Sequence, residues 1–460
     1  MINDIPIIKS FFYNGKHHVY DAYTNQLLSV SKDQYIEICQ LQKVGVEEYK
    51  VLKKETQAYK DILMMMHSGF FHSSFIDVIE HPSNKYIPYM LDRCLCFLQL
   101  QVTRDCNFKC RYCLFTRDHD INRHHEKINM PWEVAKRSID FLFDHSQESQ
   151  NITITFFGGE PLINFELIKM VVAYAEKRFI SKGISYSLTT NGSILDDRMI
   201  EFFINHNFDL LISLDGPEEI QNQHRKFYEN GIGTFAVVFQ NAFKIRDRDS
   251  EYFYKHVMFL PVLFADEDEN AVLDFYNSNG VPLTSIRKQY ANIQGIDYLH
   301  NSNEGLMNLS KENQIREMSN YQISGFDEIF NDKSPIQTPW HHSGSCIPGI
   351  VRLFVSVHGN FYPCERVIET PALSVGNIYQ GFDVIKVSSL ANIAGITEKE
   401  CKHCWAIRFC AMCAMHCTDS TKDEISRKMK LTYCNVQRKL AEAYLKTKCP
   451  SSVKREARSV

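Results

Sequence analysis

The hydrophobic and polar positions from about residue 95 onward follow a repeating pattern of short strands and amphipathic helices. Strands are expected at 97–103, 152–157, 186–189, 210–214, 257–263 and 284–290. Helices are expected between them, at 131–145, 166–179, 196–205, 234–245 and 269–278. Repeated strand–helix units predict parallel strands joined by right-handed crossovers. Six such units are too few for a closed eight-stranded barrel.

Residues 1–85 have a different pattern, which predicts a small separate unit. Two aromatic-rich runs flank Asn14-Gly15, a strong signal for a β-hairpin, and residues 27–30 suggest a third strand. Helical stretches are expected at 31–42 and 47–68, with a linker at residues 81–84. No motif marks the unit, so a packing extension without its own ligand is an alternative to a binding domain.

Length and composition limit the class of protein. The chain has 460 residues, so two or three domains are expected. Its 44% hydrophobic and 23% charged residues are ordinary, and a net charge of -4 gives no sign of general nucleic-acid binding. The N-terminus lacks the apolar core of a signal peptide, and no apolar run is long enough to span a membrane. We therefore expect a cytoplasmic protein without membrane or nucleic-acid partners.

Cysteines carry the clearest chemical signal. The chain has 15 of them and no export signal, which favours metal or redox chemistry over a disulfide framework. Cys106, Cys110 and Cys113 are spaced C-x3-C-x2-C in one short segment. Three thiolates suit an iron–sulfur cube, but they are one short of the usual four ligands, so one iron is open to a ligand that is not protein. Unrelated cysteines and a zinc site are the alternatives.

Polar motifs follow the next three expected strands. G-G-E-P occupies 158–161, T-T-N-G occupies 189–192, and S-L-D-G-P occupies 213–217, with Arg225 shortly after it. Functional sites on parallel sheets lie at the carboxyl ends of the strands, where each of these motifs falls. Glycine pairs allow a ligand close to the backbone, and a guanidinium suits a carboxylate. A plain turn and a solvated helix charge are the corresponding structural alternatives.

A second group of cysteines lies near the C-terminus. Cys346 and Cys364 flank Gly359, and a dense run follows. This run contains Cys401, Cys404, Cys410, Cys413 and Cys417, and Cys434 comes later. The eight cysteines match the requirement of two four-ligand clusters. Zinc is the alternative for C-x2-C pairs.

The loop at 106–113 and the strand-end motifs resemble those of the radical SAM superfamily. The resemblance implies an open, partial (β/α)6 barrel at 95–300, with a [4Fe-4S] cluster on Cys106, Cys110 and Cys113 that chelates S-adenosylmethionine. Residues at family positions that contact this cofactor are Tyr112, Gly158, Gly159, Glu160, Asn191, Ser213 and Arg225. The family's G-G-E-P motif binds the methionine amino group, and Arg225 matches the arginine that meets its carboxylate.

The C-terminal cysteines at 340–450 resemble the SPASM extension of peptide and protein maturases, which implies two auxiliary [4Fe-4S] clusters. The outer cluster is assigned to Cys401, Cys404, Cys410 and Cys434. The inner cluster is assigned to Cys346, Cys364, Cys413 and Cys417. The chain departs from the usual spacing by an inserted x2-Cys413 step, which leaves the assignment open. Glu365 matches an aspartate that acts as general base in sulfatase-maturating enzymes, with a structural salt bridge as the alternative.

The resemblance implies a radical SAM peptide maturase. A 5′-deoxyadenosyl radical would abstract hydrogen from a ribosomally made precursor peptide, and the product would be a thioether. Residues 1–85 resemble a winged-helix domain that binds leader peptides, and a flavodoxin or ferredoxin would supply electrons. Formylglycine formation on a sulfatase and carbon–carbon cross-linking are alternatives. An electron carrier and a zinc-dependent nucleic-acid module are rivals from other classes.

Overall fold

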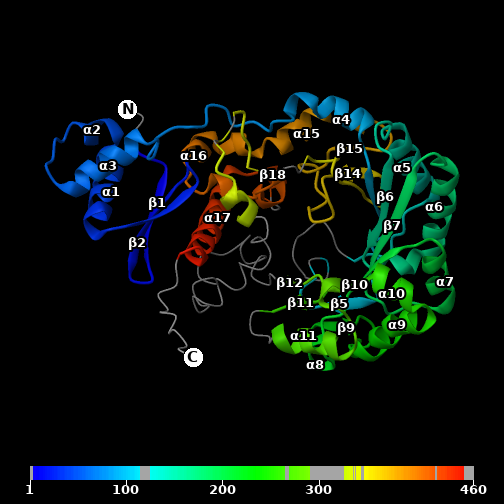
Figure 1. Ribbon diagram of the computed structural model, residues 1–460. Helices are drawn as coiled ribbons and strands as arrows, with labels where there is room; N and C mark the ends of the chain where they lie inside the picture. The colour runs from blue at the N-terminus through cyan, green and yellow to red at the C-terminus, as the bar shows by residue number, and fades with distance from the viewer. Residues whose placement is uncertain are drawn as a thin grey trace, which may run out of the picture.

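A computed structural model gives the arrangement of the chain (Figure 1). The structure describes residues 4–113, 115, 125–264, 269–290, 326–334, 336, 338–342, 347–419 and 422–449. Cys346 lies outside these residues, so its predicted role as a cluster ligand has no structural description.

The N-terminal unit is a three-stranded antiparallel sheet followed by helices. Its elements are β1 (Ile8–Tyr13), β2 (Lys16–Asp21), β3 (Gln26–Val30), α1 (Lys32–Val44), α2 (Val46–Lys50) and α3 (Gln57–His67). The hairpin turn at Asn14-Gly15 has positive φ at both residues, as its sequence predicts. The prediction of one helix over 47–68 is wrong. The chain leaves helical geometry at Lys53, with a φ of 50°, and Thr56 caps a new helix by accepting from the Tyr59 backbone N–H.

A parallel sheet forms the centre of the molecule. Its strands are β4 (Phe97–Thr103), β6 (Asn151–Gly158), β7 (Gly183–Thr190), β8 (Asp209–Ile212), β10 (Val257–Phe259), β13 (Leu353–Val355), β14 (Asn360–Tyr362), β15 (Gly376–Asn377) and β16 (Gly381–Phe382). Their order in the sheet is β10-β8-β7-β6-β4-β13-β14-β15-β16. The first six strands in this order run parallel to one another. The last three are added antiparallel. The expected strands at 97–103, 152–157, 186–189 and 210–214 are confirmed, and so is the α/β class.

Helices connect the parallel strands. They are α5 (Trp132–Asp144), η2 (Pro161–Asn164), α6 (Phe165–Arg178), α7 (Asp197–Asn205), α8 (Glu218–His224), α9 (Phe235–Arg248), α10 (Ser250–His256) and α11 (Glu269–Ser278). In Figure 1, α5, α6 and α7 lie along one side of the sheet. Their apolar faces meet residues such as Leu98, Ile154 and Leu188 in one continuous core. Burial of these faces, rather than helix propensity, fixes the helices in place.

The last strands of the barrel depart from expectation. The run at 257–263 divides into β10 and β11 (Val262–Leu263), with Pro261 between them, because proline cannot donate to the ladder. The expected strand at 284–290 is reduced to η3 (Leu283–Ser285), a parallel bridge from Ile286 to Phe259, and β12 (Gln289–Tyr290), which pairs with β11. The parallel run instead extends at the other edge, where β13 joins β4.

The C-terminal region shares the core of the barrel. Val355 and Phe361 of β13 and β14 belong to the same apolar cluster as Leu98 and Leu100. The remaining elements are η1 (Asn84–Tyr86), α4 (Ile87–Arg93), α15 (Val384–Ala391), η4 (Ile393–Thr397), α16 (Glu398–Lys402), η5 (Ile407–Phe409), η6 (Ala414–Cys417), β17 (Thr418–Asp419), β18 (Glu424–Ile425) and α17 (Arg427–Thr447). Within the described residues, no helix combines the length and apolar character needed to cross a bilayer.

The N-terminal unit packs against α17 rather than hanging from a flexible linker. Phe11 and Tyr20 share an apolar cluster with Phe409 and Tyr444, and Figure 1 shows the blue sheet beside the red helix. The expected linker is itself anchored, because the His81 backbone N–H donates to Asn392 Oδ1 at 2.6 Å.

Arg408 joins the N-terminal unit to the C-terminal region by hydrogen bonds. The side chain is 7% exposed, and it donates to the carbonyl oxygens of Ala22, Tyr23 and Ser334 at 3.0, 3.0 and 3.1 Å. These acceptors belong to the turn after β2 and to a segment that precedes the C-terminal region. One buried guanidinium therefore joins three distant stretches of chain.

Replacing Arg408 by leucine should loosen the N-terminal unit. The change leaves the buried Ala22 carbonyl oxygen and two partly buried carbonyl oxygens without this donor, so we expect the free energy of unfolding in urea to fall by about 2 kcal/mol. We also expect limited proteolysis to cut more quickly between residues 1–85 and the rest. The control is Lys399→Leu, at an exposed position on α16. Equal proteolysis of the two variants would contradict the proposed fastening.

Candidate functional site

The loop with Cys106, Cys110 and Cys113 begins directly after β4, at the carboxyl end of the parallel strands. Its middle forms β5 (Phe108–Cys110), which pairs antiparallel with β9 (Arg225–Phe227), so that Cys110 lies opposite Arg225. The Arg111 backbone N–H donates to the His224 carbonyl at 2.9 Å. The loop is therefore held by backbone hydrogen bonds to the segment that follows β8 and α8.

The three thiols of this loop influence one another. Burial and, less strongly, the neighbouring Cys110 and Cys113 raise the pKa of Cys106, while burial raises the pKa of Cys110 to about 12. Cys113 Sγ lies 3.7 Å from His125 Nε2. Thiols with raised pKa values stay protonated at neutral pH unless a cation replaces the proton. Of the described residues, no three His, Cys, Asp or Glu side chains converge closely enough to hold a single metal ion.

The two glycines of the 158–161 motif are required by close packing against the cysteine loop. A Cβ on Gly159 would lie 2.3 Å from the Asp105 carbonyl oxygen and 2.9 Å from Cys106 Cβ. A Cβ on Gly158 would lie 2.4 Å from the Thr103 carbonyl oxygen. No side chain fits at such distances. The glycines thus allow the end of β6 to touch the backbone that carries the first cysteine.

Glu160 is turned toward the neighbouring strand end. It is fully buried, and its carboxylate accepts from Leu162 N at 3.1 Å, Thr190 Oγ1 at 2.7 Å and Asn191 N at 2.6 Å. Burial raises the pKa of Glu160 to about 7, although these three donors oppose the shift. The Glu160 side chain therefore links the ends of β6 and β7 by hydrogen bonds. Its predicted contact with the methionine amino group stays a prediction.

Asn191 continues this fastening from β7 to the cysteine loop. Its Nδ2 donates to Asn107 Oδ1 at 2.8 Å, and Asn107 Nδ2 in turn donates to Ser193 Oγ at 2.8 Å. Asn107 directly follows the first cysteine. Ser213 lies beside this contact, since its backbone N–H donates to the Thr190 carbonyl at 2.9 Å and its side chain is 8% exposed. The predicted site residues after β7 and β8 are therefore gathered at one edge.

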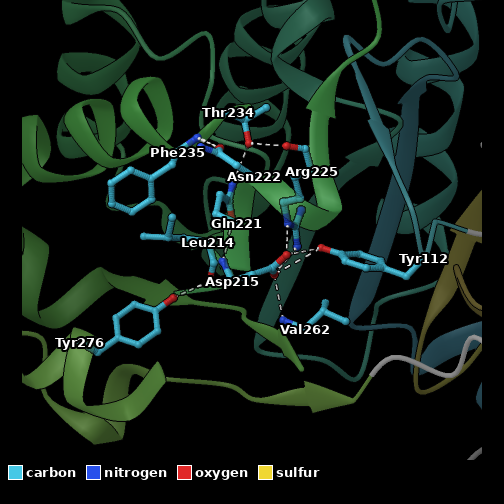
Figure 2. Close-up of polar contacts among 10 residues, drawn as sticks. All are labelled: Tyr112, Leu214, Asp215, Gln221, Asn222, Arg225, Thr234, Phe235, Val262 and Tyr276. Atoms are coloured by element: carbon cyan, nitrogen blue, oxygen red, sulfur yellow. Dashed lines mark hydrogen bonds and ion pairs between the residues drawn. The ribbon is translucent and has the colours of Figure 1, made fainter. Parts of the chain in front are cut away.

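Asp215 is the centre of a buried polar network (Figure 2). The Arg225 guanidinium donates to it with Nε at 2.9 Å and Nη2 at 3.1 Å, and the Tyr112 hydroxyl donates at 2.9 Å. The Val262 backbone N–H adds a fourth donor at 2.9 Å. Asp215 is fully buried and Arg225 is 5% exposed. The structure thus gives Arg225 an internal carboxylate as partner, whereas the sequence predicts the methionine carboxylate, a contact that stays a prediction.

A second layer of hydrogen bonds orients this network. Gln221 accepts from the Asp215 backbone N–H at 2.7 Å and donates to Thr234 Oγ1 at 3.0 Å. Thr234 donates to the Arg225 carbonyl at 3.1 Å, and the Tyr276 hydroxyl donates to the Leu214 carbonyl. Figure 2 shows these side chains arranged around Asp215. The aspartate is therefore held on several sides before any ligand binds.

Sequence reasoning missed four residues that the structure places in the site. They are Asn107, His125, Thr190 and Asp215. Asp215 and Thr190 were inside the quoted strand-end motifs, so their polar character next to buried strands was an available signal. Asn107 and His125 had no such signal, because their partners come from contacts that spacing does not reveal.

The cysteines predicted for the outer cluster lie together. Cys401, Cys404, Cys410 and Cys434 line one cavity. Burial raises the pKa of Cys410, and the other three sulfurs add to that rise. Four soft donors spread around one cavity suit an iron–sulfur cluster, whereas they do not converge closely enough for a single zinc ion.

The set predicted for the inner cluster is described only in part. Cys413 precedes η6 and Cys417 ends it, and Cys417 Sγ lies 3.5 Å from the Cys413 carbonyl oxygen. Burial raises the pKa of Cys417 to about 12, with contributions from Cys413, Cys434 and Cys401. Cys364 packs against the core of the barrel. Cys417 therefore lies near members of both predicted sets.

Glu365 forms an ion pair. Both of its carboxylate oxygens accept from Arg352 Nη1, at 2.8 and 2.7 Å, and its side chain is 18% exposed. Arg352 also lies over the Phe97 ring at 5.0 Å. This is the salt bridge named as the alternative to a catalytic base, and the catalytic role stays a prediction.

Comparison with known proteins identifies the part of the chain that carries this site. Residues 100–278 match the model of the Radical SAM superfamily. The chain therefore contains a radical SAM domain in this part. The superfamily uses a [4Fe-4S] cluster and S-adenosylmethionine. The donor set fits this group, because three partly buried thiols of one loop supply soft ligands and leave a position for the cosubstrate.

Named relatives and a solved structure agree with the assignment. A serine-type anaerobic sulfatase-maturating enzyme of Bacteroides thetaiotaomicron is 29% identical over 175 residues, 37% of this chain and 40% of the relative. The radical SAM cyclopropyl synthase TigE of Paramaledivibacter caminithermalis is 25% identical over 195 residues, 40% of this chain and 39% of the relative. Each match spans less than half of the relative's length. The structure of native anSMEcpe with bound AdoMet gives a TM-score of 0.56 at 20% identity and covers 77% of this chain and 98% of that one, which shows a shared fold.

Replacing Asp215 by asparagine should destabilise the radical SAM domain. The change leaves Arg225 buried without a counter-charge, so we expect the free energy of unfolding in urea to fall by about 3–5 kcal/mol. The control is Asp197→Asn on α7, whose side chain is 73% exposed, with an expected change within about 0.5 kcal/mol. A loss at Asp215 no larger than at Asp197 would show that the network is not a support of the fold.

Proposed function

We propose that this radical SAM enzyme modifies a ribosomally made peptide, and that Cys106, Cys110 and Cys113 hold its S-adenosylmethionine-binding cluster. The observation that carries the proposal is the attachment of this three-cysteine loop to the carboxyl ends of β6, β7 and β8. An electron carrier does not need such an arrangement of strand ends around a loop that is one ligand short.

The chain's own residues have distinct tasks in this proposal. The cluster, when bound, supplies an electron and an open iron for S-adenosylmethionine, whose cleavage yields the radical that abstracts hydrogen. Tyr112, Asn191 and Ser213 line the strand ends beside the loop and would contact the cosubstrate. Asp215 orients Tyr112 and Arg225 through the hydrogen bonds described above. Burial at these strand ends keeps water away from a reactive site.

The substrate and bond are proposed from the C-terminal cysteines. A SPASM domain at 340–450 with two auxiliary [4Fe-4S] clusters is proposed, and the four cysteines that share one cavity support the outer of the two. With a cysteine-containing precursor, the reaction that fits is thioether formation, in which one S–H and one C–H bond are replaced by an S–C bond. The carbon's hydrogen atom would leave on 5′-deoxyadenosine, the thiol hydrogen as a proton, and the remaining electron would pass to an iron–sulfur cluster. Formylglycine formation is the alternative that the sulfatase-maturating relative favours.

The N-terminal unit is proposed to bind the leader of the precursor. Within the described residues, β3 pairs with β2 alone, so its other edge is available to an added peptide strand. The exposed side chains of Phe12 on β1 and Ile36 on α1 offer apolar contacts on the same unit. The electron donor is proposed to be a flavodoxin or a ferredoxin.

Cleavage of S-adenosylmethionine tests the enzyme class. After anaerobic reconstitution with iron and sulfide, the full chain should release 5′-deoxyadenosine when dithionite is added. Cys106→Ala, Cys110→Ala and Cys113→Ala together should abolish this release. The matched control changes Cys39, Cys94 and Cys96 to alanine, which lie outside the loop and should leave cleavage intact. Equal cleavage in both triple variants would falsify the cluster assignment.

Mass spectrometry of the peptide product tests the bond. If a short cysteine-rich reading frame lies beside the gene, the probe is the peptide that it encodes, treated with the reconstituted enzyme. A thioether lowers the mass by two hydrogens and removes one thiol that iodoacetamide could alkylate. Carbon–carbon cross-linking also removes two hydrogens but leaves every thiol reactive, and formylglycine formation removes the cysteine sulfur. Either of these latter products would overturn the thioether proposal.

A further inference from the structure

The cavity lined by Cys401, Cys404, Cys410 and Cys434 also contains basic side chains that the predicted chemistry does not use. Lys430, Arg438 and His342 belong to its wall. Lys430 is fully buried on the first turn of α17, and its Nζ lies 3.5 Å from Cys401 Sγ. Its other hydrogen bond goes to Thr397 Oγ1. The ammonium group therefore points at a predicted cluster ligand.

The position of Lys430 is unfavourable without an anion in the cavity. The structure gives it no carboxylate partner among the described residues, because Glu400, which also lines the cavity, is paired with Arg427. The N-terminal end of a helix carries partial positive charge, so an ammonium on the first turn gains nothing from the helix dipole. Burying an unpaired charge costs several kcal/mol. A negatively charged group in the cavity would remove that cost.

Arg438 lies further along α17 than Lys430 and approaches the same group of sulfurs. Although burial opposes its charge, the neighbouring Cys404 and Cys434 raise the pKa of Arg438, and its side chain reaches Cys404. Four thiolates outweigh the positive charge of an oxidised iron–sulfur core, so the bound group is a dianion. Lys430 and Arg438 together match that charge, which supports a cluster as the occupant of the cavity.

His342 adds an N–H donor to the same wall. Its ring is 6% exposed, and neither Nδ1 nor Nε2 has a hydrogen-bond partner. Burial, together with His341 and Lys430, lowers the pKa of His342 well below its ordinary value, although the nearby Met412 backbone opposes the shift, so the ring is neutral and carries one N–H. A buried imidazole without a partner is costly, and a cluster sulfur in the cavity would accept this hydrogen bond.

We propose that Lys430, with Arg438 and His342, raises the reduction potential of an iron–sulfur cluster bound by Cys401, Cys404, Cys410 and Cys434. Cluster potentials depend on net charge, on hydrogen bonds to sulfur and on exposure, and this wall acts on the first two. Positive charge beside the cluster stabilises its reduced state more than its oxidised state, because the reduced state carries one more electron. The inference rests on the proposed function, since it requires an auxiliary cluster at this site.

The test is an EPR-monitored redox titration of the reconstituted full-length holoenzyme. Lys430→Met removes the charge at similar side-chain length, and we expect the reduction equilibrium constant of one cluster to fall about tenfold, or ~59 mV for one electron. The other couples serve as internal references and should not move. Lys430→Arg should restore the potential, and Lys428→Met, an exposed position on the same helix, should leave it unchanged.

Iron analysis and cosubstrate cleavage separate this inference from the proposed function. An unchanged set of potentials in Lys430→Met, at about twelve irons per chain, would overturn the inference while S-adenosylmethionine cleavage persists. Zinc in place of four irons in the wild-type chain would overturn it as well. Should Lys430→Met lose iron, Arg438→Gln decides the matter by the same shift. Failure of the wild-type chain to cleave S-adenosylmethionine would instead refute the radical SAM function.

Discussion

The close contact between the cysteine loop and the strand ends is the constraint on which the rest of the site depends. Gly159 lies so near Asp105 and Cys106 that no side chain could replace its hydrogen. Hydrogen bonds from Asn191 to Asn107 and from Tyr112 to Asp215 hold the same loop from the two following strands. A loop fixed on three sides loses little further freedom when it binds a ligand, so the site is largely pre-organised.

Buried charges at these strand ends are satisfied within the protein. Asp215 receives a bidentate guanidinium, a phenol and a backbone N–H, and Glu160 receives three donors from its own turn and the end of β7. Such groups would be costly in a dry interior if any donor were missing. The carboxylates therefore act first as fasteners between neighbouring strands. A ligand that binds here meets surfaces whose polar groups already have fixed directions.

In the C-terminal region, by contrast, some buried polar groups lack the partners that would satisfy them among the described residues. Among the described residues around the four-cysteine cavity, Lys430 is buried without a carboxylate partner and His342 without a hydrogen-bond partner, while the sulfurs of Cys404 and Cys434 lie near Arg438. The imbalance is local, and these side chains all line one cavity. The buried charges at the strand ends are thus paired within the protein, whereas the charges around the cysteine cavity favour an anionic occupant. The N-terminal unit is bound to this second region through Arg408 and the aromatic cluster on α17.

The sequence by itself determined the α/β class, the alternation of parallel strands and helices along the chain, the hairpin at Asn14-Gly15 and the presence of a loop with three closely spaced cysteines. These features depend on periodicity and on neighbours along the chain. The four cysteines that it assigned to one cluster, Cys401, Cys404, Cys410 and Cys434, all line one cavity in the structure. Only the tertiary structure decided the partners of Glu160, Arg225 and Lys430. Their partners come from other segments, and whether a buried charge meets a carboxylate, a backbone amide or a thiol depends on packing that no local pattern encodes. For the same reason, the strand expected at 284–290 is reduced to β12, while β13 pairs with β4. Strand pairing is decided by which edges meet in the folded core.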